Sequence, residues 1–263
     1  MIDLEVISIM PESDPRPTPL LFVHGMWHAA WCWDEYFLPY FAGLGYEVHA
    51  VSLRGHGGSS SDRSLRWCRI RHYVEDLARV ASDLRASPVL IGHSMGATVV
   101  QRYISSSAVP AAVLLAPVPR TGVGLITLRF LLRHPLVFLW CNLTMSMEGV
   151  ISTAARERQM LFSDDTAEED VLRYQNLLQD ESYLAYLDLL FLDLPKPEKV
   201  DTPLLVLGAE NDFVIRKSQV IKTARACGAE SDILPGLAHG MILDSRWRTV
   251  AERISTWLTG LGI

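Results

Sequence analysis

Short runs of aliphatic and β-branched residues alternate with longer amphipathic stretches along this chain, and no other feature of the sequence restricts the fold as strongly. The short runs lack a polar–apolar alternation, which is typical of strands that are buried on both faces of a sheet. We therefore expect an α/β architecture, with a mostly parallel sheet that is flanked by helices on both sides. The expected strands are 4–9 at one edge, 19–23, 46–53, 88–91, 111–115, 203–207 and 232–234. The expected helices are 30–44, 70–86, 95–107, 217–227 and 246–260.

One long interval interrupts this alternation. Between 117 and 203 the chain is several times longer than the roughly 12 residues that a crossover connection needs. Apolar residues in the stretch 171–191 recur at helical spacing, and Thr166 followed by Glu169 predicts a capping box. We expect two parts. These are a core of residues 1–117 and 203–263, and a mainly helical cap of residues 118–202 that is inserted over the sheet.

Charge and composition exclude several classes of protein. The 263 residues carry a net charge of −6 and contain no run of Lys or Arg, which argues against a nucleic-acid partner. The longest apolar stretch, 122–141, is broken by two arginines and a proline, so no stable membrane insertion is expected. Residues 1–15 lack the basic start and the apolar centre of a signal peptide. Four separated cysteines without a C-x-x-C pair favour buried thiols in a reducing cytoplasm, and we expect a cytoplasmic monomer or homodimer.

The segment 92–96 reads Gly-His-Ser-Met-Gly, a G-x-S-x-G motif that is centred on Ser94. So short a motif is weak evidence alone, but this one follows the apolar run 88–91 and opens the expected helix 95–107. A nucleophile elbow requires this strand, sharp turn and helix, and it needs glycine on both sides because side chains there would collide with neighbouring chain. The sequence therefore predicts Ser94 as a nucleophile at the end of a strand, beside the amino terminus of a helix.

A serine hydroxyl needs a base, and His239 is the best placed of the eight histidines. It lies in a loop between the last expected strand and the last expected helix, whereas His93 is expected to have a structural or solvent-facing role. The base in turn needs an acid that fixes its tautomer. We expect Asp212, which follows the strand 203–207, to supply it, with Glu210 as the neighbouring alternative.

An oxyanion hole needs two backbone N–H donors that are aimed at the same point. Met95, directly after the nucleophile, is expected to supply one. The loop after the strand 19–23 is expected to supply the other, from Met26, with Trp27 as second choice.

These motifs together resemble the α/β-hydrolase superfamily of serine-nucleophile esterases. The matching positions are His24-Gly25, Arg54-Gly55-His56-Gly57, the segment 92–96, Asp212 and His239-Gly240. The chain order serine, aspartate, histidine is also the order of this superfamily. The segment 24–33 is similar to that of the plant methylesterase and hydroxynitrile lyase group and of bacterial relatives of broad esterase type.

Two departures from that narrower group are visible. Ser52 stands where an aspartate often precedes Leu-Arg-Gly-His-Gly, a position that is usually structural. A lysine that the hydroxynitrile lyases commonly use has no counterpart near Asp212 to His239, because Lys217 and Lys222 fall in an expected helix. The resemblance therefore implies an esterase more than a lyase.

Other site chemistries find little support in the sequence. There is no H-E-x-x-H, no paired C-x-x-C, no G-x-G-x-x-G after a strand and no P-loop, so neither a metal nor a cofactor is expected. The glycines at 55, 57 and 58 indicate a loop, with a phosphate cradle as a minor alternative. Serine rather than aspartate at position 94 argues against a haloalkane dehalogenase or an epoxide hydrolase.

The expected cap is rich in large apolar residues, which favours an apolar pocket between cap and sheet. We expect a small-molecule substrate, a lipophilic carboxylic ester, lactone or thioester, to be cleaved through an acyl-enzyme. Fold and triad do not fix the chemistry, so four alternatives remain: carbon–carbon bond hydrolysis, cofactor-free peroxidation, cyanohydrin cleavage and a weakly catalytic ligand receptor. The expected substrate-binding residues are Trp27, Phe138, Trp140, Tyr183 and Tyr186.

Overall fold

The computed structural model describes residues 2–194, 196 and 200–263. Its centre is a seven-stranded sheet with the order β1-β3-β2-β4-β5-β6-β7, in which β1 is antiparallel to β3 and the other pairings are parallel. The expected mostly parallel sheet with an early edge strand is confirmed. The strands are β1 (Val6–Ile9), β2 (Leu20–Val23), β3 (Val48–Val51), β4 (Val89–His93), β5 (Ala112–Leu115), β6 (Leu204–Ala209) and β7 (Glu230–Leu234).

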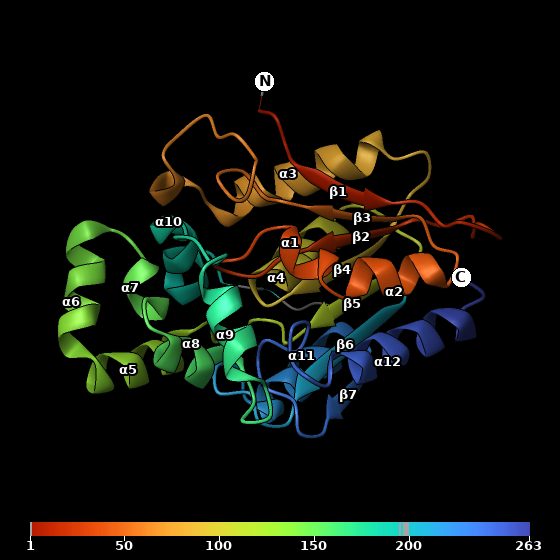
Figure 1. Ribbon diagram of the computed structural model, residues 1–263. Coiled ribbons are helices and arrows are strands. Elements are labelled where there is room, and N and C mark those ends of the chain that lie inside the picture. The colour runs from red at the N-terminus through yellow and green to blue at the C-terminus, as the bar shows by residue number, and fades with distance from the viewer. Residues whose placement is uncertain (1, 195, 197–199) are drawn as a thin grey trace.

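Helices cover both faces of this sheet, and the strands β2 to β6 are buried at every residue. Such burial explains why these strands are continuous apolar runs in the sequence. Helix α2 contacts α12, and α3 contacts α4; Figure 1 shows α2 and α12 in front of the sheet and α3 behind it. The helices of these layers are α1 (Trp31–Asp34), α2 (Phe37–Gly43), α3 (Ile70–Asp83), α4 (Met95–Ile104), α11 (Lys217–Cys227) and α12 (Trp247–Gly260), with a short 3-10 turn η1 (Leu65–Trp67).

The expected helix 30–44 is wrong as a single element, because the structure divides it into α1 and α2. Tyr36 leaves the helical conformation between them, with φ −139°. Pro39 lacks the N–H that would bond to the carbonyl of Glu35, so a continuous helix would lose a hydrogen bond there. The Tyr36 ring instead stacks on Trp247 of α12, with ring centroids 4.8 Å apart.

The long interval between β5 and β6 is helical as expected. Figure 1 shows α5 to α8 and α10 beyond the carboxyl ends of the parallel strands, on the left of the view. The expected capping box at Thr166 is wrong: α9 begins at Glu168 with Ala167 as its N-cap, and the Thr166 hydroxyl lies 3.4 Å from that of Ser163. We call the following elements the inserted helices: α5 (Gly124–Arg133), α6 (Pro135–Thr144), α7 (Glu148–Ile151), α8 (Ala154–Leu161), α9 (Glu168–Gln175), α10 (Tyr183–Leu187) and the π-helical turn η2 (Asp188–Leu192).

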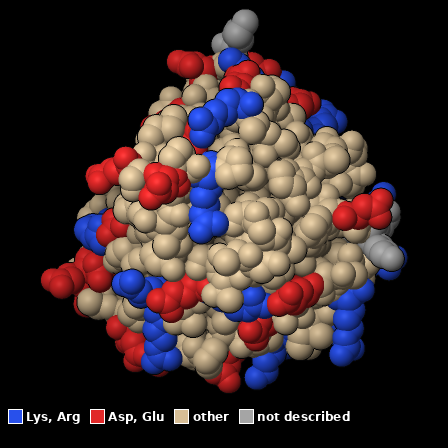
Figure 2. Space-filling model, turned by 90° about the vertical axis from the view of Figure 1, so that its right-hand side faces the viewer, with Lys and Arg blue, Asp and Glu red and all other residues tan. Residues whose placement is uncertain are grey.

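The face of the molecule that lies opposite the inserted helices has a mixed charge pattern (Figure 2). Figure 2 shows the side at the right of Figure 1, where acidic and basic side chains are interspersed around an uncharged centre. A field of one sign, which nucleic acid would need, is not visible on this face.

Within the described residues, no single helix has the length and apolarity to cross a membrane. Helices α5 and α6 pass that test only as a pair, and they are bent by 117° at the break between them.

Candidate active site

Ser94 lies at the sharp turn between β4 and α4. Its backbone has φ 52° and ψ −114°, a conformation that L-residues rarely adopt outside functional turns. The two flanking glycines are sterically required. A Cβ on Gly92 would lie 2.5 Å from the carbonyl oxygen of Gly96, and a Cβ on Gly96 would lie 2.3 Å from that of Val23. The G-x-S-x-G motif therefore has the geometry that the sequence predicted for a nucleophile elbow.

The structure brings Ser94, His239 and Asp212 together in one hydrogen-bonded series. His239 Nδ1 lies 2.8 Å from Asp212 Oδ2, and His239 Nε2 lies 2.9 Å from Ser94 Oγ. The carboxylate selects the tautomer, because Nδ1–H donates to it and leaves Nε2 to accept the serine proton. Asp212 is itself held in place by the N–H groups of Val214 and Ile215, each 2.7 Å from Oδ1.

The structure also places two neighbours of this series, Glu210 and His93. The exposed Glu210 accepts the N–H of Gly236 and makes no hydrogen bond to His239, so Asp212 rather than Glu210 faces the imidazole. His93 Nε2 donates to the carbonyl oxygen of His239 over 2.8 Å. Burial holds the pKa of His93 well below its ordinary value, so a neutral imidazole supports the His239 backbone.

The backbone amides of Met26 and Met95 are free of hydrogen-bond partners among the described residues, while that of Trp27 is not. Trp27 N–H donates to the Glu181 carboxylate over 3.3 Å. Of the two donors that the sequence left open, Met26 is therefore the one whose N–H has no partner among the described residues. Its carbonyl is held by His28 Nδ1 over 2.7 Å, and burial lowers the pKa of His28 to about 4, so this ring is neutral.

Glu181 is a residue that sequence reasoning missed. Its fully buried carboxylate accepts hydrogen bonds from Trp27 N–H, from Tyr73 OH over 3.0 Å and from His56 Nε2 over 3.2 Å. The other ring nitrogen of His56 faces the carbonyl oxygen of Arg54 at 3.3 Å. Burial lowers the pKa of His56, but the Glu181 charge, the hydrogen bond to Glu181 and hydrogen bonds to the backbone together raise this pKa above its ordinary value, which favours the protonated ring. Glu181 lies in the polar run Gln179-Asp180-Glu181-Ser182, which gives no sequence signal that separates it from a solvent-facing loop carboxylate.

The glycine loop at 55–58 does not form a phosphate cradle. The N–H of Gly57 donates to the side-chain oxygen of Gln179 over 2.7 Å, and the Glu5 carboxylate lies against Gly58. An acidic group and an occupied amide both oppose phosphate binding. This loop instead joins the core to the segment that follows α9.

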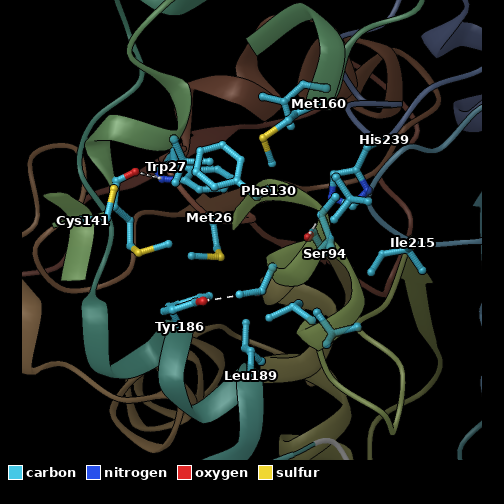
Figure 3. Close-up of a pocket in the computed structure, with 18 of the residues that line it drawn as sticks. Met26, Trp27, Ser94, Phe130, Cys141, Met160, Tyr186, Leu189, Ile215 and His239 are labelled. Carbon is cyan, nitrogen blue, oxygen red and sulfur yellow. Dashed lines mark hydrogen bonds between the residues drawn. The ribbon is translucent and has the colours of Figure 1, made fainter. Parts of the chain in front are cut away.

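An apolar pocket opens beside Ser94 and His239. Figure 3 shows these two residues on one side of the pocket and Cys141 on the other, with Phe130 between them. Trp27, Phe138 and Tyr186 line the pocket as the sequence predicted. The remaining lining residues are Met26, Val118, Val123, Ile126, Thr127, Asn142, Met147, Val150, Met160, Leu161, Leu189, Val214 and Ile215.

Two expected substrate-binding residues do not line this pocket. Trp140 is 64% exposed on the outer side of α6, because the pocket-facing positions of that helix are Phe138, Cys141 and Asn142. Tyr183 lies behind the residues that line the pocket, and its hydroxyl donates to the side-chain oxygen of Asn142, one of those residues, over 2.7 Å. Helical spacing places a residue on one side of a helix but does not say which side faces the site.

In the part of the chain that the structure describes, no group of three or more His, Cys, Asp or Glu side chains has the arrangement of a metal site. The four cysteines are buried and unpaired, as expected from their spacing.

Comparison with known proteins defines the family. The family model described as "Alpha/beta hydrolase family" matches residues 20–253, and the chain therefore belongs to the α/β-hydrolase family. A non-heme chloroperoxidase from Burkholderia pyrrocinia is 38% identical over 108 residues, which cover 38% of this chain and 37% of that protein. The chain thus spans well under half the length of this curated relative.

Solved structures match over nearly the whole chain. An esterase from Exiguobacterium antarcticum has a TM-score of 0.77 at 17% identity, covering 98% of this chain and 96% of its own. An enol-lactonase from Burkholderia xenovorans LB400 has a TM-score of 0.76 at 16% identity, with 98% and 97% covered. These matches support the same fold.

Proposed function

We propose that this chain is a serine hydrolase that cleaves a lipophilic carboxylic ester through an acyl-enzyme. The observation that carries the proposal is the hydrogen-bonded series of Ser94, His239 and Asp212 at the wall of an apolar pocket. A nucleophile within reach of its base, and a base oriented by an acid, is the arrangement that acyl transfer requires. The names of the fold relatives, an esterase and an enol-lactonase, favour an ester or a lactone.

In the acylation step, Ser94 Oγ attacks the carbonyl carbon of the substrate while His239 Nε2 takes the hydroxyl proton. Asp212 stabilises the imidazolium that forms. The carbonyl oxygen becomes negative and accepts hydrogen bonds from the backbone N–H groups of Met26 and Met95. The bond to the leaving oxygen then breaks, and His239 returns the proton to that oxygen.

In the deacylation step, a water molecule gives a proton to His239 and attacks the acyl carbon. The bond to Ser94 Oγ breaks, the carboxylic acid leaves, and the serine regains its proton from His239. The apolar lining favours an acyl or alcohol part without charge, because the pocket offers few polar partners. We also propose that residues 118–202 act as a cap, since the inserted helices supply most of that lining.

The proposal is tested with a panel of p-nitrophenyl esters of increasing chain length, together with lactones and thioesters. We expect hydrolysis that is fastest for an apolar acyl chain, and Ser94→Ala should lower it by a factor of about 10⁴ or more. The chloroperoxidase relative supports one second candidate, peroxidation at the same site. Peroxide-dependent halogenation without hydrolysis of any member of the panel would favour that candidate instead.

A further inference from the structure

Helices α5 and α6 are apolar on two opposite sides. One side lines the pocket, through residues such as Phe130 and Phe138. The other side faces solvent and carries seven large apolar side chains whose exposed fractions run from 40% to 80%. We call these seven the outer patch: Leu125, Leu128, Leu132, Leu136, Leu139, Trp140 and Leu143. A helix that is apolar all round is ordinarily buried, so an exposed patch of this size indicates a binding surface.

The spacing of the outer patch places it on a single face of each helix. On α6 the exposed residues Leu136, Leu139, Trp140 and Leu143 follow the i, i+3, i+4, i+7 pattern of a continuous helical stripe. The first residue of α6, Pro135, is also exposed beside this stripe. The patch is therefore continuous along α6 and is not a scatter of single apolar residues, which would need no explanation.

The charges of this segment differ from those of the rest of the chain. The whole chain carries a net charge of −6, yet residues 121–147 contain no Asp or Glu. Arg129 and Arg133 lie on α5, and Arg133 is exposed. The exposed Glu148 and the half-buried Arg156 also border the patch, so basic residues outnumber acidic ones there. An apolar face with this basic excess, and with a tryptophan in it, complements a lipid surface with negatively charged headgroups.

We propose that α5 and α6 dock on an anionic lipid surface, with the outer patch at the headgroup boundary and both arginines toward the headgroups. Each helix has 10 residues and is about 15 Å long, half of the roughly 30 Å of a bilayer core. Their bend of 117° also fits helices that lie along a surface. A second copy of the chain fits less well, since a two-fold contact through this patch would bring together two borders that each carry more basic than acidic residues.

Docking in this way would place the pocket against the lipid, because the inner sides of the same two helices line it. A lipophilic ester that is dissolved in the lipid would then have a short path to Ser94. The docking itself does not depend on the proposed hydrolysis, and it is measured without substrate.

The test is co-sedimentation of the full chain with vesicles of phosphatidylcholine that contain phosphatidylglycerol. We expect the wild-type chain to sediment with these vesicles and to release at high salt. The double variant L132S/L136S should bind at least about tenfold more weakly, since two exposed leucines are lost. Trp140→Ser provides a second variant with the same expected direction. Leu172→Ser is the matched control, because Leu172 is 47% exposed on α9, outside the patch, and should bind as the wild type does.

Two outcomes would overturn the proposal. The wild-type chain would remain in the supernatant with anionic vesicles, or the control variant would lose binding as strongly as the patch variants. Light scattering tests the other possible occupant, a second copy of the chain. If the wild type is a dimer that does not bind vesicles, and L132S/L136S is a monomer, the patch is a contact between two copies. Thermal unfolding of each variant shows that its fold is intact.

Discussion

At the residue scale, the role proposed for Asp212 depends on its two oxygens having different partners. One oxygen is fixed by backbone N–H groups and the other faces His239 Nδ1. The amide in Asp212→Asn would present either a donor or a weaker acceptor to Nδ1 and would disturb the tautomer of His239. We expect kcat to fall by a factor of about 10³ to 10⁴ with an intact fold, as judged by steady-state kinetics and circular dichroism.

Glu210→Gln is the matched control for this prediction. Glu210 is exposed and bonds only to the N–H of Gly236 among the described residues, so its neutral amide should leave kcat unchanged within about threefold. A larger loss in this variant than in Asp212→Asn would assign the acid to Glu210.

A second prediction concerns Glu157 of α8, whose buried carboxyl should make the unfolding free energy depend on pH. Neither of its carboxylate oxygens has a hydrogen-bond partner among the described residues, and the side chain is fully buried. Burial raises its pKa to about 8 from an ordinary 4.5. The folded state therefore binds a proton that the unfolded state releases between these values, and this carboxyl destabilises the fold increasingly as pH rises from 4.5 toward 8.

Urea unfolding at pH 5 and pH 8 tests this assignment. Relative to the wild type, Glu157→Gln should gain about 2 kcal/mol or more of unfolding free energy between the two pH values, because the amide does not titrate. The exposed Glu168→Gln serves as a control with no such gain. An equal pH dependence in the wild type and in Glu157→Gln would contradict the buried charge.

At the scale of elements, Glu181 ties the segment before α10 to the loop after β2. Removal of its carboxylate in Glu181→Ala would leave the buried His56 ring and three neutral donors, the N–H groups of Trp27 and Ser182 and the Tyr73 hydroxyl, without an acceptor. We expect the unfolding free energy to fall by about 3 to 5 kcal/mol. We also expect kcat to fall more than KM changes, since the displaced Trp27 backbone moves the neighbouring Met26 amide.

The variant Glu181→Gln separates the effect of the charge from that of the hydrogen bonds, because it keeps an acceptor oxygen while removing the charge. It should fold, restore part of kcat and lower the pKa of His56, which titration by nuclear magnetic resonance measures. The exposed Glu148→Gln should change none of these quantities. Loss of stability in Glu181→Ala with kcat unchanged would restrict Glu181 to a structural role.

Element boundaries show where sequence patterns are sufficient and where they are not. Strands β2 to β6 could be predicted because burial on both faces leaves mostly apolar residues in them, with His49 and His93 as exceptions. The break at Tyr36 could not, because stacking of its ring on Trp247 depends on a helix distant in the sequence. Thr166 has the spacing of a capping box, but its side chain lies beside Ser163 and not at the helix terminus.

At the scale of the whole molecule, the inserted helices and the residue that follows them are joined to the core by partly buried polar contacts. Asp188 of η2 pairs with Arg69 and accepts the N–H of Ile70, the first residue of α3. Asp193 pairs with Arg102 of α4. These contacts fix the far wall of the pocket relative to the sheet that carries Ser94.

The proximity of Ser94, Asp212 and His239 could be predicted because each residue follows a strand, and the carboxyl ends of parallel strands meet at one edge of the sheet. It could not predict Glu181, whose partners come from three separate segments. It also could not separate the inner from the outer side of α6, because both sides are apolar. Trp140 was therefore expected in the pocket and lies instead in the outer patch.

The most direct measurement is the intact mass of the chain shortly after it is mixed with a p-nitrophenyl ester. We expect the wild-type mass to rise by one acyl group while p-nitrophenol is released, and we expect no mass increase for Ser94→Ala. An acyl group on the Ser94→Ala chain, or rapid hydrolysis by that variant, would contradict a mechanism in which this hydroxyl is the nucleophile.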